Sequence, residues 1–479
     1  MPTPVIAIFD IGKTNKKLFL FNERYEIIWE KAEQFAEIPD EDGDPCEDLK
    51  RLTHWVESSM SEVLDLPDFT VRAVNFSTYG ASLVYLDAEC HPIGCLYNYL
   101  KPYPDAVRRQ FYQTYGDEAT MALQTASPNL DSLNSGLMLY RIKYDKPRLY
   151  WRIWYALHLP QYLSFLFTRQ VLSDVTSIGC HTMLWDFEKN QYHDWVRAEK
   201  LDNLFAPVLP SDSFLKAIIM DRPLYVGVGL HDSSAALIPY LASFQEPFVL
   251  ISTGTWCVSM NPFNSQPLTP EELQYDCLNY MHYKGQPVKA SRLFAGYEHE
   301  QQTRRLAEHF HVAIDHYVGI DYNPVLIEQL REHSMPVNGH GEPTGSQMLS
   351  MRGSLFAERN LSAFATYEEA YHQLMLDIIA QQLISTNLVL ADSSDGRTSV
   401  KRIFVDGGFG KNPIYMNLLA TAFPDIEVFA ASVAQASALG AALAIHHHWN
   451  PLPLPGNSIE LKKYTAFQPQ RRTTSLGSF

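Results

Sequence analysis

Arg402-Ile403-Phe404-Val405-Asp406-Gly407-Gly408-Phe409-Gly410-Lys411-Asn412 is a β-rich run that ends in paired glycines and a short polar turn. A strand that ends in this way leaves bare backbone against which a bulky ligand can lie. Two further stretches have the same form, an apolar strand that runs into a small turn containing glycine, and they are Val5–Lys17 and Phe248–Thr255. Together the three stretches predict a nucleotide site built between two similar halves.

Composition limits the classes of protein to which the chain can belong. At 479 residues it is long enough for two or more domains, and its hydrophobic share of 46% is ordinary for a globular protein. The net charge of −16 argues against nucleic acid as a partner, which needs a basic face. Phosphate ligands are not excluded, because loops can present backbone N–H groups locally. No run approaches the ~18 apolar residues of a membrane span, so we expect no membrane partner.

The six cysteines are scattered and form no Cys-x-x-Cys pair. Their spacing indicates neither a zinc site nor a disulfide framework. The N-terminus also has no basic region followed by a long apolar stretch, so it is not a signal peptide. Free thiols and the missing signal favour a cytoplasmic protein.

Apolar runs and turn residues predict the order of the elements. Residues 5–36 form a strand meander, 71–77 a further strand, and 104–170 are mainly helical. His181–Phe187 is predicted as a strand that ends in a turn at 188–190. Near residue 240 the pattern restarts, with a strand at 248–252, a turn at 253–255 and a returning strand at 256–260. This repeat predicts two halves with a common core.

A long helix precedes the glycine pair. Thr366 and Glu369 have the spacing of a capping box, and Ala370, Leu374 and Ile378 follow at intervals of four residues. The helix is predicted to lead to the strand at 402–405. Beyond that strand, Ala434–Ala442 is a helix of small residues, for which close packing against a sheet is the default interpretation.

The first glycine turn resembles a P-loop only superficially. Gly12-Lys13-Thr14 fits the end of that motif, but Ala7 stands where its first glycine belongs, and Leu18–Phe21 favours a strand instead of the helix that should follow. We therefore predict a phosphate-binding hairpin. The alternative is an ordinary hairpin with a solvated turn.

In the phosphate-binding interpretation the hairpin residues have distinct tasks. Its backbone and the Thr14 hydroxyl face phosphate oxygens, Lys17 neutralises charge, and Asp10 holds Mg²⁺ through water. Ser252-Thr253-Gly254-Thr255 is predicted as a second phosphate hairpin. Turns of serine, threonine and glycine are common without any ligand, and this alternative stays open.

Gly227-Val228-Gly229-Leu230-His231-Asp232 nearly forms a dinucleotide-binding motif. Asp232 stands where the third glycine should be, so that fold is disfavoured. Asp232 precedes a predicted helix and could simply be its N-cap. The functional hypothesis is that its carboxylate accepts the proton of an attacking hydroxyl.

In this order and spacing the motifs resemble the FGGY family of carbohydrate kinases, from Asp10 to about Ala442. The resemblance is strongest at His231–Ala235, at Ser252–Trp256, and at Asp406-Gly407-Gly408 with Asn412. It implies an α/β fold of two ribonuclease H-like domains, of the actin, sugar kinase and Hsp70 type, with a central cleft. The implied boundaries are an N-terminal domain at 1–240, a C-terminal domain at 241–455 and a tail at 456–479.

The resemblance also implies a role for each motif. Asp232 is the general base, and Asp10 binds the Mg²⁺–ATP complex. The implied phosphate and nucleotide contacts are Gly12, Lys13, Thr14, Lys17, Thr253, Gly254, Thr255, Gly407, Gly408 and Asn412. The implied sugar contacts are Tyr79, Gly80, Ala81, His231 and Asp232.

Some positions depart from the family pattern. Lys13 precedes Thr14 where the family has threonine or serine directly after the glycine, so the phosphate contacts can shift by one residue. Tyr99 replaces an acid that many relatives use near the sugar, and Gln435 stands where a glutamate is common. The segment Asn75–Tyr79 does not match glycerol kinases.

The resulting prediction is an ATP-dependent kinase of a small sugar. The Thr78-Tyr79-Gly80 loop is most similar to that of rhamnulose kinases, so a deoxyhexulose such as L-rhamnulose is the preferred substrate, with L-fuculose or xylulose as alternatives. A non-catalytic protein that binds sugar or nucleotide on the same fold is the rival from another class. The sequence leaves open whether the protein forms a homodimer.

Overall fold

The computed structural model describes residues 2–334, 355–390, 399–454, 456 and 459–465. The chain divides into two compact units. Unit 1 comprises residues 1–245, 261–290 and 433–459, and unit 2 comprises residues 246–260, 291–432 and 460–479. These units are groups of mutual contacts, and the kinase domain boundaries given above stay a prediction.

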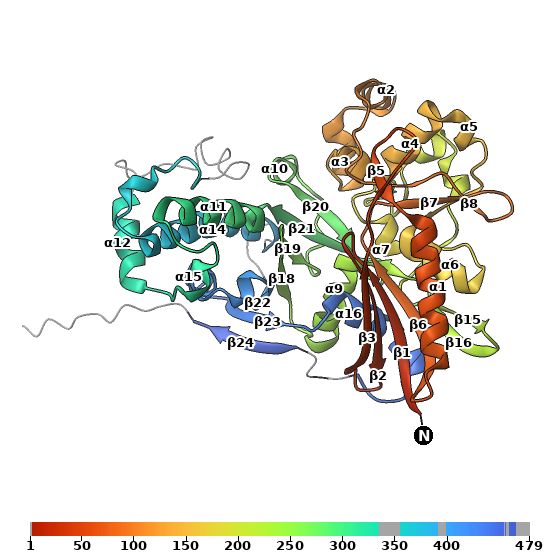
Figure 1. The fold of residues 1–479 in the computed structure, drawn as a ribbon. Coiled ribbons are helices and arrows are strands. Elements are labelled where there is room, and N and C mark those ends of the chain that lie inside the picture. Colours follow the sequence, from red (N-terminus) through yellow and green to blue (C-terminus); the bar gives the residue numbers. More distant parts are fainter. Residues whose placement is uncertain (1, 335–354, 391–398, 455, 457–458, 466–479) are drawn as a thin grey trace, which may run out of the picture. The chain divides into compact units, whose positions relative to one another are not determined.

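Unit 1 is built on a mixed sheet with the strand order β15-β16-β6-β1-β2-β3, and a short strand, β17, also pairs with β6 (Figure 1). Strands β1, β16 and β17 all run parallel to β6, whereas β1–β2–β3 is an antiparallel meander. The bounds are β1 Thr3–Ile11, β2 Asn15–Asn22, β3 Ile27–Gln34, β6 Phe69–Thr78, β15 Phe214–Ile219, β16 Arg222–Gly227 and β17 Leu230–His231. The predicted meander over residues 5–36 is confirmed.

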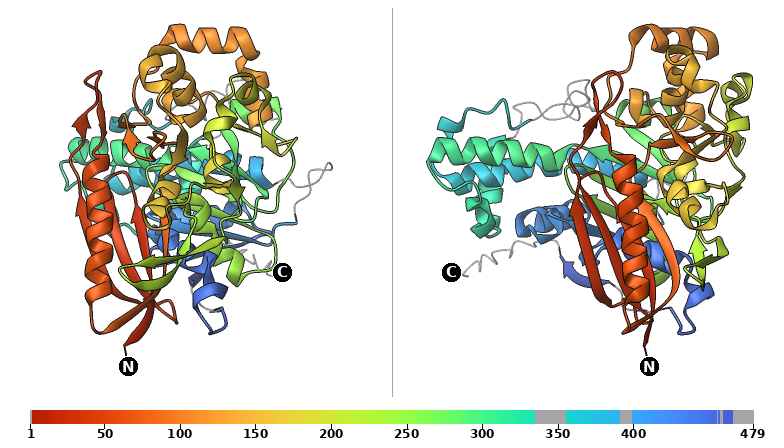
Figure 2. Two further views of the ribbon diagram at one scale, coloured as in Figure 1. Left: turned by 90° about the vertical axis from the view of Figure 1, so that its right-hand side faces the viewer. Right: turned by 45° about the vertical axis from the view of Figure 1, so that its right-hand side comes forward.

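Strand β1 is apolar from Val5 to Phe9 because both faces of the sheet are covered. Val5, Ala7, Phe9 and Ile11 point into a core shared with Trp55 on helix α1. The alternate residues, Ile6 and Ile8, are also fully buried, and helices α9 and α16 pack on β6. The helices of this sheet are α1 (Leu49–Asp65), α6 (Leu159–Thr168), α9 (Asp232–Ser243) and α16 (Ala436–Ala444) (Figures 1 and 2). Continuous apolar runs are typical of strands buried on two sides.

Helices α9 and α16 approach so closely that one position requires glycine. A Cβ atom on Gly440 would lie 1.9 Å from the carbonyl oxygen of Ala235. The small residues of the predicted 434–442 helix therefore serve close packing, here against another helix.

Replacing Gly440 with alanine is expected to lower the free energy of unfolding by about 1–3 kcal/mol, because the two helix backbones must move apart. Chemical denaturation measures this loss. Gly319→Ala is the matched control, since a Cβ at Gly319 meets no atom within 4 Å. Equal stability of the two variants would contradict the close-packing interpretation.

The rest of unit 1 is a helical region with small sheets around a separate apolar core, which includes Tyr85, Phe111, Tyr140 and Trp195. Its helices are α2 (Asp105–Tyr115), α3 (Glu118–Thr125), η1 (Asp131–Leu133), α4 (Ser135–Asp145), α5 (Pro147–Tyr150), α7 (Val175–Ile178), α8 (Asp194–Ala198), η2 (Leu201–Leu204) and α10 (Pro270–Gln274). One more short helix of unit 1, α17 (His446–Trp449), instead contacts Tyr25 beside the large sheet. The strands of the helical region are β4 (Ile38–Pro39), β5 (Pro45–Glu47), β7 (Leu83–Leu86), β8 (Pro92–Ile93), β9 (Leu96–Tyr97), β10 (Tyr155–His158), β11 (Ser173–Asp174), β12 (Trp185–Asp186), β13 (Gln191–Tyr192) and β14 (Val208–Leu209). Two further strands, β20 (Cys277–Met281) and β21 (Pro287–Leu293), belong to the second large sheet.

The mainly helical character of residues 104–170 is confirmed. The strand predicted over His181–Phe187 is wrong for most of its length, since only Trp185–Asp186 pairs, with Gln191–Tyr192. The residues before it are held by side chains and do not join a ladder. For example, Asn134 Nδ2 donates to the carbonyl oxygen of His181 at 2.7 Å.

Unit 2 repeats the arrangement of a hairpin beside parallel strands. Its strands belong to a sheet with the order β20-β21-β19-β18-β22-β23-β24, in which β18, β22 and β23 are parallel. The bounds are β18 Phe248–Thr253, β19 Cys257–Asn261, β22 Arg402–Gly407, β23 Glu427–Ser432 and β24 Glu460–Tyr464. The predicted restart of the pattern near residue 248 is confirmed. The tail predicted from residue 456 contains β24, and most of its other residues lie outside the described part of the chain.

Helices cover this second sheet and contribute to its core. They are α11 (Ala295–Phe310), η3 (His316–Gly319), α12 (Pro324–Ser334), η4 (Leu361–Ala363), α14 (Tyr367–Leu390), η5 (Phe409–Lys411) and α15 (Pro413–Ala422). Helix α14 begins as predicted, with Thr366 Oγ1 accepting from the Glu369 N–H at 3.1 Å. The Glu369 carboxylate instead accepts from the Ala365 N–H, one residue earlier than a capping box requires. None of the helices in the described part of the chain has the length and hydropathy of a bilayer-spanning segment.

Candidate functional site

Two aspartates lie at one edge of the unit 1 sheet. Asp10 on β1 and Leu230 on β17 both pair with Ser77 of β6, and His231 pairs with Thr78. Asp232 follows directly, as the first residue of α9. Because β1, β6 and β17 are parallel, their carboxyl ends meet here, which is the usual place for a ligand in such a sheet. The structure therefore brings together the two acids that the sequence singled out.

Asp10 is held in an environment that disfavours its charge. Burial and the nearby negative charge of Asp232 raise the pKa of Asp10 to about 6, although Ser437 and Lys17 oppose the shift. The Ser437 hydroxyl, on α16, donates to the carboxylate at 3.1 Å. A cation bound beside Asp10 would relieve this cost.

The raised pKa predicts a pH-dependent effect of Asp10→Asn on stability. The ordinary pKa of 3.8 rises to about 6 on folding, so the stability contribution of Asp10 is full below about pH 4 and is lost as pH rises to about 6. Asparagine does not titrate. The variant should therefore gain free energy of unfolding relative to the wild type across this window, by about 1–3 kcal/mol above pH 6. Denaturation of both proteins at pH 4, 5, 6 and 7 tests this, and a constant difference would contradict it.

Asp232 is positioned by its neighbours as an ionised, partly accessible carboxylate. It is not the N-cap of α9, because that position is taken by His231. Its Oδ1 accepts from the Ser233 N–H at 2.6 Å and lies 3.1 Å from His231 Nε2. Burial alone would raise its pKa, but the charge and hydrogen bond of His231 and the Ser233 N–H lower it. The alternative of a simple helix cap does not hold.

His231 lies behind Asp232, in a closely packed position. Its Nε2 is 3.2 Å from Cys180 Sγ, and its Nδ1 is 3.4 Å from the Ser234 hydroxyl. A Cβ atom on Gly80 would lie 2.8 Å from Cys180 Sγ and 3.0 Å from the His231 ring. Gly80 of the Thr78-Tyr79-Gly80 loop is thus required for this packing, and His231 is 4% exposed.

The hairpin at Gly12–Lys17 is braced by a lysine that sequence reasoning missed. Lys16 is fully buried and forms an ion pair with Glu47 at 2.8 Å. Its ammonium also donates to the carbonyl oxygens of Gly12 and Lys13, at 3.2 and 2.9 Å. Lys16 therefore shapes the turn from inside. Strand alternation, which places Lys16 on the same face as Leu18 and Leu20, was the available signal.

The other hairpin residues are distributed around the turn. Lys13 pairs with Glu37 at 2.6 Å, and Lys17 donates to Gln435 Oε1 at 3.3 Å. Thr14 is exposed at the tip. Thr14 and the backbone are thus the groups of this turn that a phosphate can reach without displacing a partner.

Part of the loop after β6 is buried and bonded within the protein. The Tyr79 hydroxyl donates to Glu47 at 3.3 Å, and Tyr79 is 8% exposed. Ala81 has a φ of 66°, a left-handed conformation that turns the chain sharply. The predicted sugar contact of Tyr79 is therefore restricted to the small accessible part of its ring.

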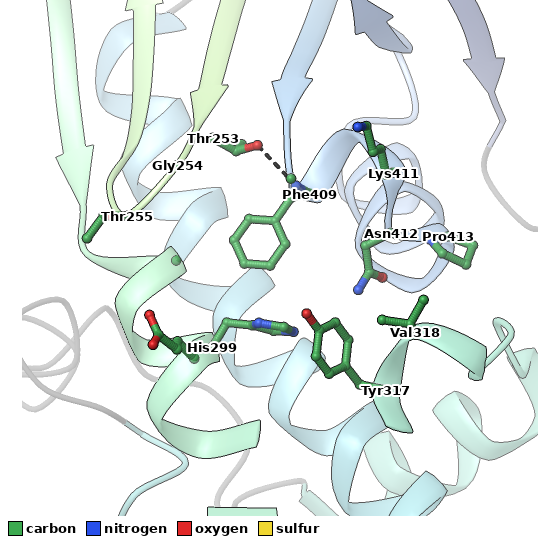
Figure 3. Close-up of a pocket in the computed structure, with 13 residues that line it drawn as sticks. Thr253, Gly254, Thr255, His299, Tyr317, Val318, Phe409, Lys411, Asn412 and Pro413 are labelled. Carbon is green, nitrogen blue, oxygen red and sulfur yellow. Dashed lines mark hydrogen bonds between the residues drawn. The ribbon is translucent and has the colours of Figure 1, made fainter. Parts of the chain in front are cut away.

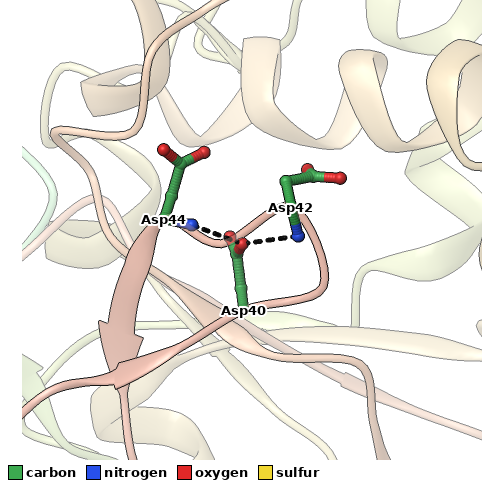
Figure 4. A group of neighbouring side chains, drawn as sticks. All are labelled: Asp40, Asp42 and Asp44. Carbon is green, nitrogen blue, oxygen red and sulfur yellow. Dashed lines mark hydrogen bonds between the residues drawn. The ribbon is translucent and has the colours of Figure 1, made fainter.

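Three aspartates in the same unit are paired with one lysine side chain of the protein. Asp40, Asp42 and Asp44 lie together on one loop, where Asp40 Oδ1 accepts from the N–H groups of the other two (Figure 4). The Lys101 ammonium lies 2.5, 3.0 and 2.6 Å from Asp40, Asp42 and Asp44. Burial opposes the charge of Lys101, but these hydrogen bonds raise its pKa. The loop is an ion cluster and not a vacant metal site.

Unit 2 contains a pocket of about 530 Å³ at the ends of β18 and β22 (Figure 3). Its lining includes the predicted Thr253, Gly254, Thr255, Gly408 and Asn412, together with Gly296, His299, Glu300, Tyr317, Val318, Phe409, Lys411 and Pro413. The predicted residues from 253–255 and 408–412 are thus brought together. The contribution of α11 and η3 was missed, because no motif marks those residues.

Thr253 and Gly407 fix the turn on which the pocket rests. The Thr253 hydroxyl donates to the carbonyl oxygen of Asp406 at 2.6 Å and accepts from the Phe409 N–H at 3.1 Å. Gly407 has a φ of 93°, and a Cβ there would lie 2.0 Å from the Thr253 carbonyl oxygen. A Cβ atom on Gly408 would meet no atom within 4 Å. Gly407 therefore allows the turn, and Gly408 supplies the bare backbone that faces the pocket.

Comparison with known proteins identifies the family. The FGGY family of carbohydrate kinases, N-terminal domain, matches residues 5–214, and the carbohydrate kinase FGGY, C-terminal domain, matches residues 245–345. Together the matches cover more than half of the chain. The protein belongs to the FGGY family of carbohydrate kinases, which use ATP as phosphate donor.

Solved structures share the fold over nearly the whole length. A carbohydrate kinase from Novosphingobium aromaticivorans is 22% identical with a TM-score of 0.76, over 98% of this chain and 95% of that one. The xylulose kinase from Lactobacillus acidophilus is 14% identical with a TM-score of 0.75, over 97% and 94%. The predicted α/β fold with two ribonuclease H-like domains is confirmed. A search of curated proteins found no match.

Proposed function

We propose that the protein transfers the γ-phosphoryl group of ATP to a hydroxyl of a ketose, with a deoxyhexulose such as L-rhamnulose as the preferred substrate. The observation that carries this proposal is the pair of carboxylates at the sheet edge of unit 1, where the pKa of Asp232 is lowered and the pKa of Asp10 is raised to about 6. Two acids with opposite pKa shifts are typical of sites in which they have different tasks.

In the proposed reaction Asp232 accepts the proton of the sugar hydroxyl as its oxygen attacks the γ-phosphorus. The bond from that phosphorus to the bridging oxygen of ADP breaks, and ADP leaves with the electron pair. His231 orients Asp232 through the 3.1 Å contact and favours its ionised form. The reaction requires the γ-phosphate to reach Asp232, and this meeting stays a prediction.

The nucleotide is proposed to bind in the unit 2 pocket, against Gly408 and Asn412, with the turn at Thr253–Thr255 near its phosphates. Gly254 and Thr255 are exposed in that turn. On unit 1, the phosphates are proposed to contact the turn at Gly12–Thr14, with Lys17 supplying positive charge. Oriented backbone N–H groups and small side chains suit anionic oxygens.

Mg²⁺ is proposed to be held by Asp10 through water. The site fits a hard divalent cation, because Asp10 is a partly buried carboxylate beside the negative charge of Asp232, and Ser437 already orients it. When bound, the ion neutralises charge on the phosphates. Asp10 itself contributes the fixed negative charge that positions it.

Tyr79, Gly80 and Ala81 are proposed to line the sugar site, together with His231 and Asp232. Similar solved structures are named for different substrates, since one from Lactobacillus acidophilus is a xylulose kinase and another from the same organism is a gluconate kinase, each 14% identical to this chain. L-Fuculose and xylulose therefore remain the alternatives to L-rhamnulose.

A panel of ketoses and polyols tests the function through ADP release. We expect L-rhamnulose to give the highest kcat/KM, and release that depends on both the sugar and Mg²⁺. A higher kcat/KM with L-fuculose or xylulose would correct the substrate and keep the activity. Binding of ATP or of a sugar without any sugar-dependent increase in ADP release would instead favour a non-catalytic sugar- or nucleotide-binding protein.

A further inference from the structure

The unit 2 pocket contains a histidine whose protonation is fixed by a chain of hydrogen bonds. Asn412 Nδ2 donates to the Tyr371 hydroxyl at 2.7 Å, and that hydroxyl lies 3.0 Å from His299 Nε2. Asn412 follows β22, Tyr371 is on α14 and His299 is on α11. Three separate elements thus meet at one line of polar atoms.

The direction of each of these hydrogen bonds follows from the orientation of the Asn412 amide. Asn412 is the N-cap of α15, and its Oδ1 accepts from the N–H groups of Ile414 and Tyr415, each at 3.0 Å. The amide can therefore turn only its Nδ2 donor toward Tyr371. The Tyr371 oxygen accepts this bond, and we assign its own proton to His299 Nε2, the other polar atom within hydrogen-bond distance, because the hydroxyl then both accepts and donates.

The phenol keeps that proton, since burial raises the pKa of Tyr371. Burial also lowers the pKa of His299 to about 4, so its ring is neutral at pH 7. A neutral imidazole carries one proton, and here Nε2 is the acceptor. The proton is therefore on Nδ1.

The Nδ1–H group is available for a ligand. No group in the described part of the chain accepts a hydrogen bond from it, and His299 lines the pocket between Phe409 and Tyr317 (Figure 3). These rings fix the imidazole, with centroid distances of 5.3 and 4.8 Å and near-perpendicular planes. The pocket thus presents an oriented donor between two aromatic walls, which suits the edge of a flat heterocycle.

We propose that His299 is a specificity-determining residue that donates a hydrogen bond from Nδ1 to a ring nitrogen of a purine base, and that Asn412 and Tyr371 are positioning residues for this donor. The inference rests on the proposed binding of ATP in the unit 2 pocket. It adds the group that recognises the base and the means by which its tautomer is set.

The test compares ATP with 1-deaza-, 3-deaza- and 7-deaza-ATP, each of which replaces one ring nitrogen by C–H. Dissociation constants are measured by calorimetry on the full chain with Mg²⁺. For the wild type we expect at least one analogue to bind about three- to tenfold more weakly than ATP, the value of one neutral hydrogen bond. His299→Phe should weaken the binding of ATP by a similar factor. In this variant ATP and that analogue should then have equal dissociation constants.

His309→Phe is the matched control, because His309 is on the same helix and exposed. It should leave all four dissociation constants unchanged. The inference is overturned if no analogue is weaker than ATP in the wild type, or if the weakening persists undiminished in His299→Phe.

A smaller change, Tyr371→Phe, tests the hydrogen-bond relay from Asn412 through Tyr371 to His299. Nitrogen-15 spectra of the wild type should show His299 with a protonated Nδ1 and an unprotonated Nε2. Tyr371→Phe should produce a mixture of tautomers and weaken ATP binding by about threefold or less. The opposite tautomer in the wild type, or unaltered spectra in Tyr371→Phe, would overturn the relay.

These outcomes are distinguishable from failure of the proposed function. If ATP does not bind, or no sugar increases ADP release, the proposed kinase reaction fails. If ATP binds and turnover is normal while the analogues do not separate wild type from His299→Phe, only the role of His299 fails.

Discussion

Asp232→Asn is expected to lower kcat by about 10³-fold or more, because asparagine has nearly the same shape but cannot accept the proton of the attacking hydroxyl. The fold should be preserved, since the side chain is partly accessible and an amide oxygen can still accept from the Ser233 N–H. The affinity for ATP should change little. Steady-state kinetics with the best sugar of the panel, together with an ATP dissociation constant, measures both effects.

Asp68→Asn is the control for this substitution, because Asp68 is exposed in the turn before β6. It should leave kcat unchanged. Near-full turnover of Asp232→Asn would reject the role of general base, whereas a rise in KM at constant kcat would reassign Asp232 to binding.

Lys16→Met should lower the free energy of unfolding by about 3–5 kcal/mol, since it leaves the carboxylate of Glu47 buried without its partner. Lys16 and Glu47 are 0% and 4% exposed. The substitution also removes the ammonium group that donates to the carbonyl oxygens of Gly12 and Lys13, so the turn should bind phosphate less well. Denaturant titration gives the stability, and the KM for ATP reports on the turn.

A double variant separates the charge from the packing. Lys16→Met/Glu47→Leu should recover more than half of the lost stability, because no charge is then left buried. Lys31→Met is the matched control, since its ion pair with Glu62 is substantially exposed and should contribute at most about 1 kcal/mol. A loss no larger in Lys16→Met than in Lys31→Met would contradict the structural role of Lys16.

The sequence predicted features that depend on short segments. The hairpins at Gly12 and Gly254 were found because an apolar run followed by a polar glycine turn is a local pattern. The roles of Asp10 and Asp232 in one reaction were instead implied by the family resemblance, because their approach depends on the pairing of both β1 and β17 with β6.

Features that depend on distant partners were not found. The burial of Lys16 requires Glu47, which lies 31 residues away on another strand. His299 and Tyr317 belong to elements without a motif, and only tertiary packing brings them to the pocket. The strand expected over His181–Phe187 shows the same limit, because contacts such as that of Asn134 with His181 replaced the ladder that the apolar pattern favoured.

The loop at Asp40–Asp44 has a consequence for experiments in chelating buffers. Its counter-ion is the side chain of Lys101, covalently tethered to the same molecule, so its effective concentration cannot be lowered by dilution or dialysis. EDTA that removes free divalent ions should abolish phosphoryl transfer and leave this loop intact. A protein inactivated in this way should regain full activity as soon as the metal is restored, with no refolding step.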